Sequence, residues 1–393
     1  MKRSLRAGLC SAVFSFVLFS SAALAQSPPS SAGNAAFAAG NFDAAAAVYT
    51  AALSKNPDDP DAELGIGTVE LYRNHLDAAR THLQRALALA PNSPRARTRL
   101  DSIEKRTGGP SDFQIAFAGS QARVALIAVD PLPTLKATIN GVPATLAIDT
   151  GGGNLDISES LVNRLHLSTS VVGEGIFAGG RRAQLRGVRI NQLELPGVTV
   201  RGIPGGIMPG GPPGIDGIIG TSFLYHFLAT VDYGHQMLVL RPTTDSAAFL
   251  ASAKAAGATA VPMWLAGDHF LFARARVNAA PDALYSIDTG GPGIGVDLTT
   301  SSLAAAGITP DASNPQSMHG GGGATQFLPF TAASVTIGNF TLHDLPGIYV
   351  PSGGLDGVFP FAVAGRISHE FFRHTALTLD FSTMTLVLEP AHG

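Results

Sequence analysis

The sequence is poor in cysteine, in charge and in aromatic side chains. Cys10 is the only cysteine among 393 residues, which excludes a disulfide within the chain and leaves nothing for thiol chemistry beyond residue 10. Charged residues make up 14% of the chain and the formal net charge is −3, so the basic surface of a nucleic-acid-binding protein is missing. A hydrophobic share of 45% excludes a wholly disordered chain. We therefore expect folded domains without a nucleic-acid partner.

Glycine and proline are abundant instead, with 45 and 26 residues. They follow no three-residue period, so a collagen-like structure is excluded and many short strands joined by tight turns are favoured. The length exceeds that of one ordinary domain and indicates two or three.

The first 25 residues have the pattern of a secretory signal peptide. Basic residues within the first six positions precede an apolar run over 9–24, and Ala23-Leu24-Ala25 forms a small-residue cleavage site. We expect residues 1–25 to be removed and the product to be periplasmic or secreted, with no integral membrane span left. A retained membrane anchor is the alternative, although the apolar run is short.

A helical repeat follows. Asn41-Phe42-Asp43-Ala44-Ala45 recurs 34 residues later as His75-Leu76-Asp77-Ala78-Ala79. This period, with small residues at helix contacts and proline after each helix pair, resembles the tetratricopeptide repeat. The resemblance implies an all-α module over 30–107, closed by a helix over 93–105. The module is either a packing appendage or a groove for a protein partner. We expect no part for it in chemistry, so its deletion should leave the cleavage of short peptides intact.

The rest of the chain contains one pattern twice. Ile148-Asp149-Thr150-Gly151-Gly152 recurs as Ile287-Asp288-Thr289-Gly290-Gly291, 139 residues later. Val188–Leu195 recurs as Val335–Leu342, and the segment beginning at Phe223 recurs 148 residues on. Offsets that grow gradually indicate two homologous β-rich lobes with loop insertions. We place the lobes at 112–242 and 258–393, with a short helix between them near 243–260.

The two Asp-Thr-Gly loops resemble those of aspartic peptidases, most closely the retropepsin-like branch with two lobes fused. Asp216-Gly217-Ile218-Ile219-Gly220 resembles the apolar segment behind the catalytic loop of that family. The resemblance implies an all-β bilobal acid-protease-like fold. It also implies that Asp149 and Asp288 are catalytic and that the supporting loop residues are Thr150, Gly151, Thr289 and Gly290. By the same resemblance, Thr150 and Thr289 are expected to hydrogen-bond across the axis between the lobes.

Paired carboxylates fit peptide hydrolysis without metal, cofactor or covalent intermediate. Two adjacent carboxylates cannot both ionise, so one activates water while the other donates a proton. The sequence thus predicts an exported aspartic endopeptidase that acts on a peptide or protein substrate. The alternative is a catalytically inactive protein that binds peptides or proteins in the same cleft and through the helical repeats. Each lobe could also pair with a lobe of another chain.

Some positions depart from the family pattern. Gly152 and Gly291 stand where pepsin-like enzymes carry Ser or Thr and retroviral ones Ala, so a hydrogen bond to the carboxylate is lost and higher pKa values are expected. In the second lobe, Ser368 stands where the first has Gly220, unless Asp356-Gly357 matches Asp216-Gly217 instead.

Glycine-rich segments at 173–180 and 319–323 fall where the family has flap hairpins, and such composition suits a mobile cover. An apolar cleft is expected near these flaps, with Ile294 beside it. The candidate cleft and flap residues are Gly175, Phe177, Ile218, Ile219, Gly321 and Gly322.

Other motifs favour structural roles. His369 and His374 are five positions apart and cannot share one helix face, so no metal site is expected there. Asp156 and Asp297, which follow the two Asp-Thr-Gly motifs, are expected to be turn or strand-end residues.

Overall fold

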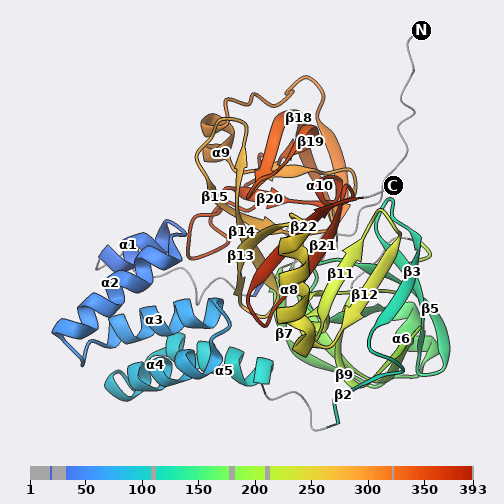
Figure 1. Ribbon diagram of the computed structural model, residues 1–393, viewed down its shortest axis with the longest axis horizontal. Coiled ribbons are helices and arrows are strands. Elements are labelled where there is room, and N and C mark those ends of the chain that lie inside the picture. Colours follow the sequence, from blue (N-terminus) through green and yellow to red (C-terminus); the bar gives the residue numbers. More distant parts are fainter. Residues whose placement is uncertain are drawn as a thin grey trace.

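The computed structural model describes residues 18–19, 32–107, 112–176, 182–208, 213–320 and 323–391. Figure 1 shows a group of helices beside two β-rich lobes. The predicted signal cleavage site lies outside the described residues. Of the predicted signal peptide, the structure describes only β1 (Leu18–Phe19), which pairs antiparallel with β7 (Thr169–Ile176). Among the described residues, no helix is both long and apolar enough to cross a membrane.

The predicted repeat forms two helix pairs and a closing helix. Asn41 and Asp59 accept backbone N–H groups at the starts of α2 and α3, as expected of N-cap residues. The ring of Tyr49 packs on Gly33 and Gly65, where a Cβ atom would lie only 2.5 Å and 2.4 Å from ring atoms. The helices are α1 (Ala32–Ala38), α2 (Phe42–Lys55), α3 (Pro60–Tyr72), α4 (Leu76–Leu89) and α5 (Pro94–Thr107).

The first lobe begins with β2 (Gln114–Phe117), an additional strand on β9. Its other elements are β3 (Ala122–Ala128), β4 (Thr134–Ile139), β5 (Val142–Ile148), β6 (Leu155–Ser158), α6 (Glu159–Arg164), β7, β8 (Arg182–Leu195), β9 (Val198–Met208), β10 (Gly217–Ile219), α7 (Thr221–Leu224), β11 (Leu228–Asp232) and β12 (Met237–Arg241).

The second lobe repeats this order from β3 onward, element by element. It consists of β13 (Thr259–Ala266), β14 (Phe270–Val277), β15 (Ala283–Ile287), β16 (Val296–Leu298), α9 (Thr300–Ala305), β17 (Gln316–Gly320), β18 (Gly323–Ile337), β19 (Phe340–Tyr349), β20 (Gly365–Ile367), α10 (His369–Phe372), β21 (Thr375–Asp380) and β22 (Thr385–Pro390). The expected helix between the lobes is present as the 3-10 turn Thr243–Asp245 followed by α8 (Ser246–Ala255).

Equivalent turns show the duplication at the level of single residues. Asn140 and Asn278 both have positive φ, at 47° and 52°, which asparagine tolerates better than most residues. The Asn140 side chain accepts the N–H of Gln192 at 2.9 Å, and the Asn278 side chain accepts that of Ser334 at 3.1 Å. Each asparagine thus ties its β-hairpin to a later strand of its own lobe.

An antiparallel sheet joins the lobes in the order β3-β12-β11-β21-β22-β13. Its centre lies between β11 and β21, where Thr230 pairs with Thr378, the residue 148 positions later, and their hydroxyl oxygens are 2.7 Å apart. Identical residues paired at the middle of a symmetric register define a pseudo-two-fold axis between the lobes.

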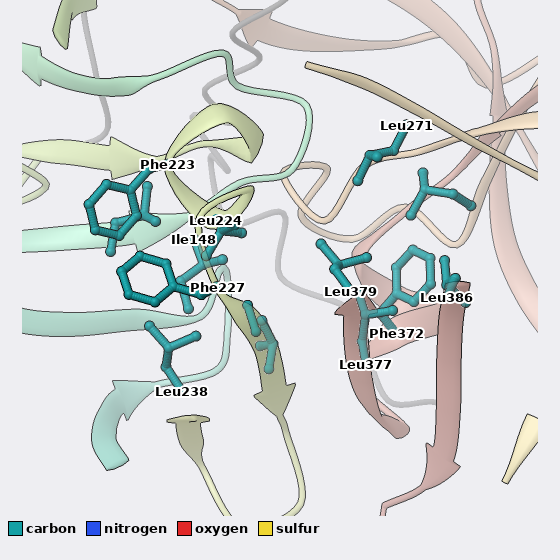
Figure 2. Close-up of a cluster of buried hydrophobic side chains, with 14 of the residues drawn as sticks. Ile148, Phe223, Leu224, Phe227, Leu238, Leu271, Phe372, Leu377, Leu379 and Leu386 are labelled. Atoms are coloured by element: carbon teal, nitrogen blue, oxygen red, sulfur yellow. The ribbon is translucent and has the colours of Figure 1, made fainter. Parts of the chain in front are cut away.

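One hydrophobic core continues across both lobes. Ile148, Phe223 and Phe227 of the first lobe and Phe372 and Leu379 of the second belong to one cluster of buried side chains. Figure 2 shows these two sets facing each other across the joining strands. Burial of apolar surface therefore packs the two Asp-Thr-Gly loops against one common core.

The helical module is docked on the second lobe and shares a core with it. The rings of Phe42, Tyr72, Trp264 and Phe361 contact one another at centroid distances of 5.1–5.9 Å. Polar contacts flank the rings: Ala362 donates its N–H to Ala38 at 2.7 Å, and Arg106 donates to the carbonyls of Leu265 and Gly267. The module is therefore part of the lobe's packing, which changes the outcome expected of its deletion.

Candidate active site

Asp149 and Asp288 occupy equivalent places at the ends of buried strands. Asp149 follows β5 and donates its N–H to Ile219 at 3.1 Å, and Asp288 follows β15 and donates its N–H to Ile367 at 3.0 Å. β10 and β20 run parallel to β5 and β15 in matching register. The same strand arrangement therefore presents each carboxylate at the pseudo-two-fold axis.

Thr150 and Thr289 link the two loops across that axis. The hydroxyl of Thr289 accepts the N–H of Thr150 at 3.1 Å, and the hydroxyl of Thr150 accepts the N–H of Thr289 at 3.0 Å. Each hydroxyl also donates to the opposite strand, Thr150 to Ile287 at 3.1 Å and Thr289 to Ile148 at 3.4 Å. All four bonds are buried, so the loops are held in one relative position. This is the contact that the family resemblance implied.

The glycines that follow the threonines let the carboxylates approach the opposite loop. A Cβ atom on Gly151 would lie 2.5 Å from the Cγ atom of Asp288, and one on Gly290 would lie 2.2 Å from that of Asp149. Gly151 and Gly290 also donate their N–H groups at 2.8 Å to the carboxylate two residues earlier. Only glycine fits at either position.

The environment of the pair favours a retained proton. Asp149 and Asp288 are each 2% exposed. Burial raises the pKa of Asp149 well above its usual range, and the charge of Asp288 and a hydrogen bond between the two carboxyl groups raise it further. The N–H of Gly151 and the charge of Arg366 act in the opposite direction. The pair can therefore hold one proton and one negative charge together.

The register decides how the second lobe matches the first. Gly365, Arg366 and Ile367 of β20 pair with β15 as Gly217, Ile218 and Ile219 of β10 pair with β5, so Ser368 is the equivalent of Gly220. The alternative match is wrong, because Asp356-Gly357 lies in a turn before β20.

Neighbouring side chains explain why a glycine follows each Asp-Thr-Gly motif. A Cβ atom on Gly291 would lie 2.3 Å from the hydroxyl oxygen of Ser368, which donates to the carbonyl of Asp288 at 2.6 Å. A Cβ atom on Gly152 would lie 2.7 Å from the Cδ1 atom of Ile218. The space of the family's side chain is therefore filled by Ile218 of β10 in the first lobe and by Ser368, which follows β20, in the second.

Arg366 is a site residue to which the sequence analysis gave no role. It is 2% exposed and donates from Nη1 to Oδ2 of Asp288 at 3.0 Å and from Nη2 to Oδ2 of Asp297 at 3.4 Å. The signal that could have identified it is an arginine inside an otherwise apolar strand segment, because a buried arginine requires anionic partners.

Asp156 and Asp297 were expected to be turn or strand-end residues; they lie within the short strands β6 and β16 and are buried, 8% and 6% exposed. Burial raises the pKa of each to about 6. The charge of His269 opposes this rise at Asp156, and the charge of Arg366 opposes it at Asp297.

The predicted flaps fall on antiparallel hairpins. Gly175 lies in β7 opposite Ala183 of β8, and β17 pairs with β18 in the same way in the second lobe. Phe177, Gly321 and Gly322 lie outside the described residues.

The predicted apolar cleft residues are buried. Ile219 is 0% exposed in the main core, Ile218 is 1% exposed beside Leu132 and Met208, and Ile294 is 5% exposed in the core shared with the helical module. Their side chains support the strands and loops from behind, so in this structure they are not open to a substrate.

One group of metal-ligating side chains occurs within the described residues. Asp130, His369 and Glu370 bring ligand atoms within 4.8 Å of one another. Arg373 already places a guanidinium between the two carboxylates, 2.7 Å from Asp130 and 3.1 Å from Glu370. Because an arginine supplies the positive charge there, this group is best described as an ion-pair network between the lobes.

Comparisons with known proteins agree with this geometry. A family model described as aspartyl protease matches residues 135–223, and a tetratricopeptide repeat model matches residues 31–112. The chain is therefore similar to aspartyl proteases over part of its first lobe and to tetratricopeptide repeats over the helices before it. The second lobe lies beyond the aspartyl protease match, and its assignment follows from the repeated elements and loop described above. No curated protein matches the sequence significantly.

Two solved structures illustrate the likeness of fold. A retropepsin-like aspartic protease from Rickettsia conorii is 16% identical, with a TM-score of 0.26, over 33% of this chain and 95% of its own. An aspartic proteinase from Irpex lacteus is 12% identical, with a TM-score of 0.41, over 69% of this chain and 97% of its own. The helices α1–α5 and the duplicated order of strands described above confirm the predicted fold, an acid-protease-like β structure preceded by helical repeats.

Proposed function

We propose that this protein is an aspartic-type endopeptidase in which Asp149 and Asp288 act together on a water molecule. The observation that carries the proposal is the pair of Asp-Thr-Gly loops whose threonines bond across the pseudo-two-fold axis. That linkage places two buried carboxylates together, and such a pair supplies a general base and a general acid at once.

The chemistry needs only groups that the pair provides. The ionised carboxyl takes a proton from water, and the resulting hydroxide attacks the carbonyl carbon of the peptide bond. The protonated carboxyl gives its proton to the carbonyl oxygen. The carboxyl that is now protonated gives its proton to the amide nitrogen, and the other carboxylate takes the proton of one diol hydroxyl. The C–N bond then breaks, and the pair again holds one proton and one charge. The axis has one lobe on each side, so a peptide crossing it is held on both sides of the cleaved bond, which favours cleavage within a chain.

The decisive experiment compares the full chain with Asp149→Asn and Asp288→Asn on a mixed peptide library between pH 4 and 7, with products read by mass spectrometry. Each substitution removes the shared proton, so we expect cleavage to be abolished while the fold is kept. Asp344→Asn is a matched control, because Asp344 is exposed on β19 and far in sequence from either motif. Cleavage that survives both substitutions, or wild type that cleaves nothing at any pH, would favour a protein that only binds peptides.

Export to the periplasm or the exterior belongs to the same proposal. It is supported by the basic, apolar and small-residue pattern of residues 1–25. A mature protein recovered from the producing cells should begin at Gln26. An intact Met1 on the exported protein would contradict this.

A binding role for the helical module is likewise proposed. It is supported by the match of residues 31–112 to the tetratricopeptide repeat model. Such repeats form extended binding surfaces in many proteins.

A further inference from the structure

The two halves of the candidate site differ at one buried position. Ile218 and Arg366 occupy the same place in β10 and β20, opposite Ala147 and Ser286 in the equivalent strands β5 and β15. Across the other edge of the same strands they face Asp156 and Asp297, which are equivalent to each other. The duplication therefore keeps the aspartates and exchanges an apolar side chain for a cation.

Among the described residues, Arg366 donates a hydrogen bond to Asp288, one of the two members of the dyad. Arg366 donates to Asp288 at 3.0 Å, and both side chains are almost fully buried, at 2% and 3% exposure. Its bond to Asp297 is longer, at 3.4 Å. On the side of Asp149, the equivalent Ile218 offers no charge. In a buried site where electrostatic interactions are poorly screened, this difference is large enough to separate the two carboxyl groups.

We propose that Arg366 is a positioning residue that fixes the negative charge of the dyad on Asp288 and the shared proton on Asp149. The inference rests on the proposed function and deepens it, because it assigns the roles. Asp288 takes the proton from water as general base, and Asp149 donates to the carbonyl oxygen as general acid. Arg366 itself exchanges no proton and acts through the carboxylate that it holds.

The other charged groups around the pair leave this assignment in place. Asp297 shares Arg366 with Asp288, and Asp356 acts on Asp297 through its charge. Burial raises the pKa of Tyr233, and the charges of Asp149 and Asp288 raise it further, so it stays neutral.

The lobe-joining network adds its own groups from α10 and the loop before β4. Its members are Asp130, Glu370, Arg373 and His369, and burial lowers the pKa of His369, which keeps its ring neutral. Its two carboxylates are each bonded to Arg373, so Arg366 is the cation that is bonded directly to the dyad.

The first test is the pH profile of kcat/KM for wild type, Arg366→Met and Arg366→Lys. A cation beside an aspartate lowers its pKa by roughly one to three units, so its removal should move both limbs of the profile to higher pH by about that amount. Arg366→Lys keeps the charge and should restore most of the profile. Arg276→Met is the matched control, because Arg276 forms an ion pair of the same 3.0 Å length with Asp282 on the exposed surface of the same lobe. Its profile should not move.

The second test does not depend on peptidase activity. In protein labelled with ¹³C at the aspartate carboxyl carbons, the Asp149→Asn and Asp288→Asn variants identify the two signals. We expect the Asp288 signal of wild type to change to that of a carboxylate at lower pH than the Asp149 signal. In Arg366→Met the two should titrate at closer pH values.

These measurements separate the two proposals. A wild type without cleavage would refute the peptidase while the carboxyl signals still decide where the charge lies. If Asp149 ionises first, or if Arg366→Met leaves both the titration order and the pH profile unchanged, the role given to Arg366 is wrong. Should Arg366→Met not fold, the order in which the Asp149 and Asp288 signals titrate in wild type and in Arg366→Lys decides whether the role given to Arg366 holds.

Discussion

Replacing Phe361 by alanine should loosen the helical module and the second lobe together. Phe361 lies in the segment between β19 and β20 and is 5% exposed. Its ring centroid is 5.1 Å from that of Phe42, 5.9 Å from that of Tyr72 and 5.2 Å from that of Phe272. Two of these rings belong to the helical repeats and one to the lobe, so the substitution opens a cavity at the joint.

The expected loss of stability is about 3–5 kcal/mol, the usual cost of truncating a buried phenylalanine to alanine. A domain of ordinary size is stable by about 5–15 kcal/mol, so about a fifth or more of that stability would be lost. At about 1.4 kcal/mol for each power of ten, the unfolded fraction should rise by at least two orders of magnitude.

The chain carries its own probe for this effect. Trp264 is its single tryptophan, is 5% exposed and has its ring 5.7 Å from that of Phe42. In urea, Trp264 fluorescence should report the opening of the joint, and far-ultraviolet circular dichroism the loss of the helices. We expect the two transitions to coincide in wild type and to move together to lower urea in Phe361→Ala.

A double-mutant cycle supplies the control. Phe361→Ala and Phe42→Ala should couple by about 0.5–3 kcal/mol because the rings touch. Phe223→Ala, in the core of the first lobe, should add independently to Phe42→Ala. Additive effects at the joint, or helices that unfold well before Trp264 becomes exposed, would show that the module folds on its own and refute the shared core. If the core is shared, deletion of residues 26–107 exposes Trp264 and Phe361 and should abolish folding of the second lobe.

Three further predictions concern the site. Thr150→Val removes the hydroxyl that pairs with the buried N–H of Thr289 and the carbonyl of Ile287, at a cost of about 1–3 kcal/mol of stability for each group. Urea unfolding should show this loss, and an unchanged midpoint would contradict the role of the linkage. Gly291→Ser should destabilise by collision with Ser368, and adding Ser368→Gly should restore stability; a double variant no better than the single one would exclude this explanation. Burial raises the pKa of Asp156 from 3.8 to about 6, so the folded state binds this proton more tightly, and stability should fall as pH rises through that window. Asp156→Asn should flatten this fall in urea titrations at several pH values; an equal slope would refute it.

Much of the fold could be predicted because the duplication is written in short local patterns. Asn140 and Asn278, and Asp149 and Asp288, recur with the strands that precede them, and alternating and β-branched residues specify strands locally. The helix between the lobes followed from an alanine-rich stretch near 243–260 for the same reason.

Contacts between distant segments could not be predicted in this way. The apolar residues Trp264, Phe272 and Phe361 resemble ordinary core residues of a lobe, and nothing in their spacing indicates that Phe42 and Tyr72 complete their packing. Asp156 and Asp297 were expected to be turn or strand-end residues because aspartate favours turns, yet both lie within short strands and are buried. The isoleucines behind the loops were expected at a cleft because apolar character alone does not tell a lining residue from a supporting one.

The sequence alone determined that there are two lobes, that each ends a buried strand in Asp-Thr-Gly, and that small-residue helical repeats precede them. These features depend on residues that are close together in the chain, because such residues determine the local backbone geometry and the hydrophobic periodicity. Only the tertiary structure decided that the helical module shares a core with the second lobe and that Arg366 reaches Asp288 and not Asp149. Those contacts join residues far apart in the chain, and they form only when burial of the common core brings the strands into register.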